Sequence, residues 1–309
     1  MDKKYLIGID GGGTKTELAL CRYDGSAVKT LLAAATNACD TGFEAARNTL
    51  FAAIDALISG IDQGEIGGLF AGLSGGITGD NKRLFSQALH ERYSEIPNIA
   101  NDSDIVNALS SGIPYGDGGV VISGTGSVAY ERSGGKMRRI GGWGYLIDRG
   151  GSGYDLGRDA LYASLCYFDG RGPETSLKAK LEHTLGAPID IAVGEIYKKG
   201  KTLIASLAPL VFEAYSEGDD VARAVVGENV RELCRLIRSI KAEKIVLAGG
   251  IFSHRGIMLP EIERALGGVK YDFIFPAAKP VFGAVAEAAK LCGIRADDDF
   301  TMKWQDTYK

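Results

Sequence analysis

The chain has 309 residues, enough for about two domains, and its 45% of hydrophobic residues supply apolar sequence for two cores. The net charge of -4 argues against a nucleic-acid-binding protein, which normally carries a basic face. No apolar run is long enough to span a membrane, and the first residues lead directly into a strand, so we expect no membrane partner and no signal peptide. The five cysteines are scattered and form no C-x-x-C pair, which is typical of a reduced, cytoplasmic protein: Cys21, Cys39, Cys166, Cys234 and Cys292.

The first predicted elements are two short strands joined by a glycine-rich turn. Residues 4–9 form an apolar run that ends on Asp10, and residues 17–21 form the second strand. The turn, Gly11 to Thr16, offers a row of backbone N–H groups, which bind anions, beside a carboxylate suited to Mg²⁺. The pattern is neither a P-loop nor a dinucleotide fingerprint, because the glycines have the wrong spacing and a strand follows them. A tight hairpin without a ligand is the alternative interpretation.

Strands and helices then alternate through the first half of the chain. Apolar spacing predicts an amphipathic helix over residues 43–58, and Ser103 or Asp102 is a suitable N-cap for the last helix of this half. The expected strands are 27–35, 66–73 and 96–100, and the expected helices are 43–58, 81–92 and 105–109.

The second half repeats the opening pattern. A buried strand at 118–123 runs into a glycine-rich turn, and strands at 128–131 and 137–140 follow, which indicates an internal structural repeat. Helices are expected at 156–167, 176–185, 201–215, 221–240, 258–266 and 281–291, and strands at 244–247 and 271–275. We therefore predict an α/β protein of two lobes, residues 1–114 and 115–309, the second with a helical insertion. The helix at 281–291 could instead pack back on the first lobe.

Five motifs in this order carry a resemblance to a known family. They are D-G-G-G-T at 10–14, N-D-S at 101–103, S-G-T-G-S at 123–127, G-G-W-G at 141–144 and L-A-G-G at 247–250. From Ile7 to about Ala289 the chain resembles the N-acetylglucosamine kinases and the related activator ATPases of benzoyl-CoA reductase. These belong to the superfamily of actin, heat-shock chaperones and sugar kinases. The resemblance implies two ribonuclease-H-like lobes around a central cleft, with ATP at its base and the sugar above.

The resemblance also implies the roles of residues at the nucleotide. Asp10 would orient Mg²⁺ on the β- and γ-phosphates, and Lys15 would either assist the phosphates or stay solvated. The remaining ATP-binding positions are Gly12, Gly13 and Thr14 in the first lobe and Gly124, Thr125, Gly126, Gly249 and Gly250 in the second.

At the sugar, Asp102 corresponds to the general base that takes the proton from the acceptor hydroxyl, and its alternative role is a plain helix cap. Trp143 could form a wall against the sugar or fill a gap in the core. Asn37 and Ser74 are either sugar contacts or ordinary turn residues. The positions assigned to the sugar are Asn37, Ser74, Gly75, Asp102, Thr125, Gly142, Trp143, Asp148 and Arg149.

One departure from the family pattern lies after the tryptophan loop. The family has two acidic residues in G-D-E-G-S-G, whereas this chain has Arg149 and Gly150 in their place, with Asp148 one position earlier. Asp148 could take over by a one-residue shift. Because arginine binds carboxylates, Arg149 also suggests an acidic amino sugar such as N-acetylmuramic acid, unless it faces solvent.

These observations predict an ATP- and Mg²⁺-dependent kinase that phosphorylates the 6-hydroxyl of N-acetylglucosamine or a close relative such as N-acetylmuramic acid or glucosamine. By resemblance we expect a cytoplasmic homodimer with a small-molecule sugar substrate. The alternatives are an ATPase that activates a partner redox enzyme and a non-catalytic sugar or nucleotide sensor.

Overall fold

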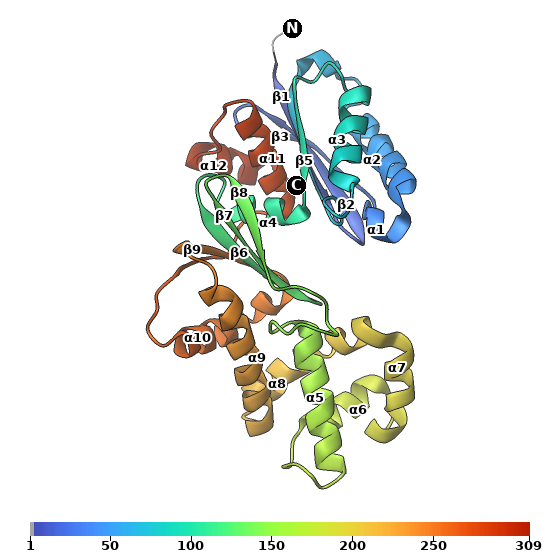
Figure 1. Cartoon of the computed structure of the whole chain (residues 1–309), viewed down its shortest axis with the longest axis vertical. Coiled ribbons are helices and arrows are strands. Elements are labelled where there is room, and N and C mark those ends of the chain that lie inside the picture. The colour runs from blue at the N-terminus through green and yellow to red at the C-terminus, as the bar shows by residue number, and fades with distance from the viewer. Residues whose placement is uncertain (1–2) are drawn as a thin grey trace. The chain divides into compact units, whose positions relative to one another are not determined.

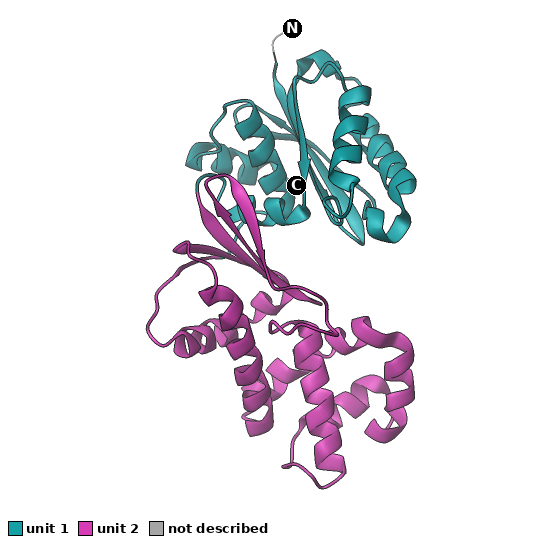
Figure 2. Ribbon diagram, viewed as in Figure 1, with its two compact units in different colours: residues 1–116, 275–309 teal, residues 117–274 magenta. Residues whose placement is uncertain are grey.

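The computed structural model describes residues 3–309 and contains two compact units. Unit 1 consists of the residues up to Gly116 together with residues 275–309, and unit 2 consists of residues 117–274 (Figure 2). The sequence-based division placed residues 275–309 with the second lobe and gave packing of the helix at 281–291 on the first lobe as an alternative. In the structure residues 275–309 group with the first unit. No helix among the described residues is long and apolar enough to cross a membrane.

Unit 1 is built on a five-stranded sheet in the order β3-β2-β1-β4-β5. The first three strands form an antiparallel meander, and β4 and β5 run parallel to β1. The strands are β1 (Tyr5–Gly11), β2 (Lys15–Arg22), β3 (Ala27–Ala34), β4 (Ile66–Leu73) and β5 (Asn98–Asp102). The helices are α1 (Ala38–Thr41), α2 (Phe43–Leu57), α3 (Asn81–Arg92), α4 (Asp104–Gly112), α11 (Pro280–Leu291) and α12 (Asp298–Thr307), with a 3-10 turn η1 (Gln63–Glu65) (Figure 1).

Unit 2 repeats this arrangement with the order β8-β7-β6-β9-β10. Its meander is antiparallel, and β9 and β10 run parallel to β6. The strands are β6 (Gly118–Ser123), β7 (Ser127–Ser133), β8 (Lys136–Ile140), β9 (Lys244–Ala248) and β10 (Asp272–Ile274). The helices are α5 (Gly153–Phe168), α6 (Leu177–Leu185), α7 (Ile189–Ser206), α8 (Ala208–Ser216), α9 (Asp220–Arg238) and α10 (Arg255–Leu266), with η2 (Gly250–His254) (Figure 1). The identical strand order and directions confirm the predicted α/β duplication of a ribonuclease-H-like unit.

The two faces of the unit 1 sheet are covered differently because side chains alternate along each strand. Ile7, Ile9 and Leu69 face a core completed by α2 and α3. On the opposite face α11 packs closely on β1, since a Cβ at Gly8 would lie 2.5 Å from the backbone nitrogen of Val285. This close packing of α11 on β1, β4 and α4 explains why the end of the chain groups with unit 1.

Three helical segments were not predicted from the sequence. Residues 36–42, where no helix was predicted, contain the single turn α1. The expected helix 201–215 corresponds to the end of α7 and then α8, so the first part of α7 was missed, and α12 was not recognised. The first part of α7 and all of α12 mix charged and apolar residues without a clean period. Only some of their apolar residues are buried by packing on neighbouring helices and strands, such as Ile189 at 0% and Trp304 at 1% exposure.

Candidate functional site

The two carboxylates singled out in the sequence lie in one row at the carboxyl edge of the unit 1 sheet. The parallel registers place Asp10 opposite Gly72 and Gly72 opposite Asp102. Neighbouring strands are about 4.8 Å apart, so the two backbones are separated by about 10 Å and present their side chains to the same face. The carboxyl ends of parallel strands are where α/β sheets bind ligands. The strand in between contributes only a glycine there, and the side chain of Asn107 occupies the space above it.

Asn107 of α4 fills the space above that glycine and fixes Asp10. Its amide donates to Asp10 Oδ1 at 2.8 Å and is buried. Burial raises the pKa of Asp10 to about 6; the hydrogen bond from Asn107 opposes this rise, the carboxylates of Asp104 and Glu17 add to it, and Lys15 opposes it. Asp10 is therefore a half-buried carboxylate that forms no ion pair with the described residues, although the charge of Lys15 lowers its pKa.

Asp102 ends β5 and is held by two contacts. Its Oδ1 accepts the backbone N–H of Ser103 at 2.7 Å, and its Oδ2 accepts from the ammonium of Lys82 at 2.5 Å. The N-cap of α4 is Ser103, whose hydroxyl accepts from the backbone N–H of Ile105. Asp102 is not needed as the cap, and its side chain remains 26% exposed. A carboxylate oriented in this way and open to solvent can accept a proton.

The proposed sugar-contact residues Asn37, Ser74 and Gly75 come from two adjoining loops. Ser74 donates its backbone N–H to Gly11 O, and Gly75 has φ +67° with no room for a side chain, because a Cβ would lie 2.4 Å from Asn37 Oδ1. Asn37 also caps α1 by accepting from the N–H of Cys39. Asn37 therefore has a structural role, and a sugar contact would be additional.

The β1–β2 turn keeps its backbone open. Gly13, Thr14 and Lys15 are exposed, and the turn is closed by a hydrogen bond from Gly12 N to Lys15 O at 2.9 Å. Nothing in unit 1 crowds Gly13, where the nearest atoms to an added Cβ are 3.7 Å away. The turn has the open N–H groups that an anion site requires.

In unit 2 the β6–β7 turn lies at the carboxyl edge of its sheet. Thr125 is exposed, and the N–H of Gly153, the first residue of α5, donates to Gly124 O at 2.7 Å. Gly249, which follows β9, has φ +103°, and a Cβ there would lie 2.3 Å from Ser123 O. The structure thus brings together the predicted nucleotide positions Gly124, Thr125, Gly126, Gly249 and Gly250.

The tryptophan loop of unit 2 is organised by its own polar groups. Trp143 is 65% exposed, so the alternative that it fills the core is wrong. The guanidinium of Arg139 lies 4.4 Å from the centre of the Trp143 ring and donates to the carbonyl of Gly141, next to Gly142. Asp148 Oδ2 accepts the backbone N–H of Trp143 at 3.1 Å. Asp148 thereby closes the loop and holds the tryptophan at the surface.

Arg149 is part of an ion-pair network on α5. Its guanidinium donates to Asp159 Oδ2 at 2.5 Å, and the amide of Asn229 donates to the same oxygen. Arg158 pairs with the other oxygen of Asp159. Arg149 therefore has a carboxylate partner within the protein rather than facing only solvent.

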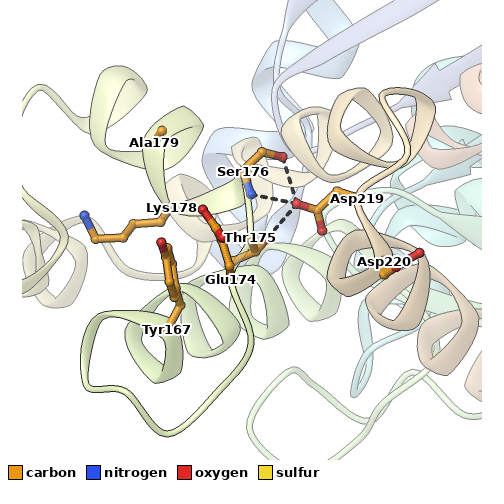
Figure 3. A pocket seen from close by; sticks show the side chains of 8 residues that line it. All are labelled: Tyr167, Glu174, Thr175, Ser176, Lys178, Ala179, Asp219 and Asp220. Atoms are coloured by element: carbon orange, nitrogen blue, oxygen red, sulfur yellow. Dashed lines mark hydrogen bonds between the residues drawn. The ribbon is translucent and has the colours of Figure 1, made fainter.

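A hollow in unit 2, of about 590 Å³, lies beside the start of α6 (Figure 3). Asp219 accepts the backbone N–H and the hydroxyl of Ser176 and the hydroxyl of Thr175, and it also caps α9 through Ala222. Burial by itself would raise the pKa of Asp219, but these hydrogen bonds hold that pKa below its usual value. The carboxylate joins α6 to α9, and its role is structural.

The donor set suits a magnesium ion that is bound largely by its substrate. The described residues contain no group of three or more His, Cys, Asp or Glu side chains that could hold a metal. Mg²⁺ in phosphoryl-transfer sites takes one or two carboxylates, and waters and phosphate oxygens complete its shell. Asp10, a half-buried carboxylate beside an open anion-binding turn, fits that requirement.

Sequence reasoning missed Lys82, Asn107 and Lys201. Asn107 could have been noticed as an amide on the apolar face of a short helix. The two lysines have no local signal, because their partners lie elsewhere in the chain.

Two ribonuclease-H-like units, each with a glycine-rich turn after its first strand, define the actin-like ATPase class, which includes the sugar kinases. Residues 7–288 match the BadF/BadG/BcrA/BcrD ATPase family, and the chain belongs to this family.

Known proteins match nearly the whole chain. An N-acetylmuramic acid/N-acetylglucosamine kinase of Clostridium acetobutylicum is 32% identical over 306 residues, which are 94% of this chain and 99% of that protein. An N-acetyl-D-glucosamine kinase of Dictyostelium discoideum is 31% identical over 84% of this chain and 88% of that protein. A crystal structure from Chromobacterium violaceum, provisionally assigned as an N-acetylglucosamine kinase, covers 94% of this chain and 99% of that chain with a TM-score of 0.71. At 22% identity this last match shows the fold alone.

Proposed function

We propose that this chain is an ATP-dependent amino-sugar kinase, which transfers the γ-phosphoryl group of ATP to a hydroxyl of N-acetylglucosamine or a close relative. The observation that carries the proposal is the row of Asp10, Gly72 and Asp102 across three parallel strands. It sets one half-buried carboxylate beside an anion-binding turn and a second, oriented carboxylate about 10 Å away, with the Asn107 side chain over the glycine between them.

Asp102 acts as the general base in this mechanism. The acceptor hydroxyl donates its proton to the carboxylate while the oxygen attacks the γ-phosphorus in line, and the bond to the β-phosphate oxygen breaks. Ser103 N–H and Lys82 keep the carboxylate in one orientation during this step. A positioned base typically contributes about 10² to 10⁴ in rate.

The phosphates are held mainly by backbone groups. Unit 1 offers the N–H groups of Gly13 and Thr14, with Lys15 exposed beside them, while the N–H of Gly12 closes the turn. Unit 2 offers the N–H groups of Thr125 and Gly126 in its own turn at 124–126. When bound at Asp10, Mg²⁺ supplies charge neutralisation on the phosphates. Phosphoryl transfer requires chiefly positioning and electrostatic stabilisation, which these groups can provide.

The acceptor is an amino sugar by analogy with the relatives, whose names give N-acetylglucosamine and N-acetylmuramic acid. We expect the 6-hydroxyl to be phosphorylated, with Asn37, Ser74 and Gly75 as the sugar contacts that unit 1 supplies. The idea that Arg149 binds the acid group of N-acetylmuramic acid requires its guanidinium to leave or share Asp159. It is dropped if Arg149→Ala leaves the ratio of kcat/KM for the acidic and neutral sugars unchanged.

The test is ATP consumption with Mg²⁺ against N-acetylglucosamine, N-acetylmuramic acid, glucosamine, N-acetylmannosamine, glucose and no sugar. Turnover that depends on an amino sugar supports the kinase and names its substrate. Sugar-independent hydrolysis would favour the ATPase that activates a redox partner. Binding of sugar or nucleotide without turnover would favour a sensor. The cytoplasmic location and the homodimer stay predictions. Light scattering of the purified chain measures its mass and so tests the homodimer.

A further inference from the structure

One cation of unit 2 lies beside the glycine-rich β6–β7 turn although the sequence places it far from that turn. The ammonium of Lys201, in α7, lies 3.7 Å from the position that a Cβ would occupy at Gly126. The centre of the Tyr145 ring, in the tryptophan loop, is 5.4 Å from the same nitrogen. Lys201 therefore extends over the backbone of the turn whose N–H groups we assign to phosphate.

A break in α7 sets the position of this lysine. Gly200 has φ +59° and ψ -141°, which is not helical and is open essentially to glycine alone. The residues after the break pack tightly on the start of α5, because a Cβ at Gly157 would lie 1.9 Å from Ile204 O, and one at Gly153 would lie 3.3 Å from Ala205 O. Lys201 thus begins a segment that is anchored on the same helix end as the turn.

The charge of Lys201 is not neutralised within the described part of the chain. No carboxylate there lies within 4 Å of its ammonium, whereas its neighbours Lys198 and Lys199 both pair with Glu195. The N-terminus of α5 holds the turn in place, since Gly153 N–H donates to Gly124 O, while the carboxylate of Asp155 caps its first turn. The unpaired lysine beside the glycine-rich turn therefore forms a site for an anion.

We propose that Lys201 binds the polyphosphate chain of the nucleotide from unit 2. The inference rests on the proposed function, in which the turn at 124–126 holds the phosphates of ATP. Lysine acts as a compact point charge in such sites and binds phosphate without a fixed fork geometry. The affinity for adenosine, which lacks phosphate, should not depend on Lys201.

The experiment compares the affinities of MgATP and adenosine by isothermal titration calorimetry on the full chain and on Lys201→Met. A charge-assisted hydrogen bond predicts a loss of about 10- to 100-fold for MgATP. The affinity for adenosine and the KM for the sugar should not change. Lys201→Arg should recover most of the loss because it keeps the charge. A lysine that served only to pack on Tyr145 would change the affinities for MgATP and adenosine equally or not at all.

Lys199→Met is the matched control, because it removes a lysine of the same helix on the other side of Gly200. Its MgATP affinity should match that of the wild type. Equal MgATP affinity of Lys201→Met and wild type would overturn the inference and leave the kinase to be judged by the sugar panel. A wild-type chain that does not bind MgATP would overturn both. If Lys201→Met does not fold by circular dichroism, Lys201→Gln, which keeps a polar side chain, replaces it in the same comparison.

Discussion

Asp102→Asn separates the role of the base from every other role of this position. Asparagine has the same shape, and its side-chain oxygen can still accept the N–H of Ser103, but it cannot take a proton from the sugar. We expect kcat to fall by about 10² to 10⁴, which corresponds to about 2.7 to 5.4 kcal/mol in the activation barrier. The affinities for MgATP and the sugar should stay close to those of the wild type.

The structure also predicts that this substitution hardly changes stability. The ion pair between Asp102 and Lys82 joins a side chain that is 26% exposed to one that is 55% exposed. Pairs of this kind contribute about 0 to 1 kcal/mol. Because α4 is capped by Ser103, no helix cap is lost. The unfolding temperature should therefore change by no more than a few degrees.

Release of ADP at saturating amino sugar measures kcat, and calorimetry measures binding of both ligands. Asp80→Asn is the matched control. Asp80 and Asp102 line one groove of unit 1, and Asp80 pairs only with Arg83 among the described residues. Its kcat should equal that of the wild type. If Asp102→Asn kept a kcat within threefold of the wild type, Asp102 would not be the base. The catalytic role proposed for the row of Asp10, Gly72 and Asp102 would then be wrong.

Three further variants test other parts of the structure. Lys82→Met removes a contact that orients Asp102, so kcat should fall about 10-fold, with KM for ATP unchanged, in steady-state assays. Gly249→Ala places a side chain at φ +103° and 2.3 Å from Ser123 O, and the strain of about 1 to 3 kcal/mol should lower the unfolding temperature and weaken MgATP binding measured by calorimetry. Asp219→Ala should destabilise the protein by about 1 to 2 kcal/mol at pH 7 in urea unfolding. Because the folded-state pKa of Asp219 is lowered, this difference is complete above the unfolded value near 4 and is lost as the pH falls through the folded pKa.

Each of these variants has a control in the chain. Arg83→Gln should leave kcat unchanged, and an equal loss in it would show that the groove as a whole matters. Gly256→Ala should be tolerated, since nothing lies within 4 Å of an added Cβ, and comparable damage there would refute the steric argument. As the control for Asp219→Ala, Asp220→Ala removes an exposed neighbouring carboxylate that pairs with Arg223 three residues away. A stability difference for Asp219→Ala that persists at pH 2 would contradict the expected link between the ionisation of Asp219 and stability.

Most elements of the fold could be predicted because their signals are local. The strand at 66–73 and the helix at 81–92 coincide with β4 and α3, where apolar runs, periodicity and flanking glycines mark both ends. The break in α7 could not be predicted, because Gly200 lies in a polar stretch and only its packing partner, α5, makes the bend favourable. The placement of residues 275–309 depends on the close approach of α11 to Gly8, which no local pattern indicates.

The candidate site divides in the same way. The glycine-rich turns and Asp102 are visible as motifs, because anion binding and base chemistry need particular residue types at strand ends. The partner of Asp102 was not visible, since Lys82 lies 20 residues earlier and meets it only when α3 packs beside β5. The pairing of Arg149 with Asp159 was likewise not predictable from the sequence. It means that any ligand of the Arg149 guanidinium must compete with the carboxylate of Asp159.

The sequence by itself determined the repeated strand–turn–strand pattern, the order of the motifs and the class of chemistry, because periodicity and turn composition act between near neighbours. Only the tertiary structure decided the row of Asp10 and Asp102, the contact of Lys82 with Asp102 and the position of Lys201 over the β6–β7 turn. These depend on register between strands and on helix packing. Both are set by contacts between residues far apart in the chain, which exist only once the whole unit has folded.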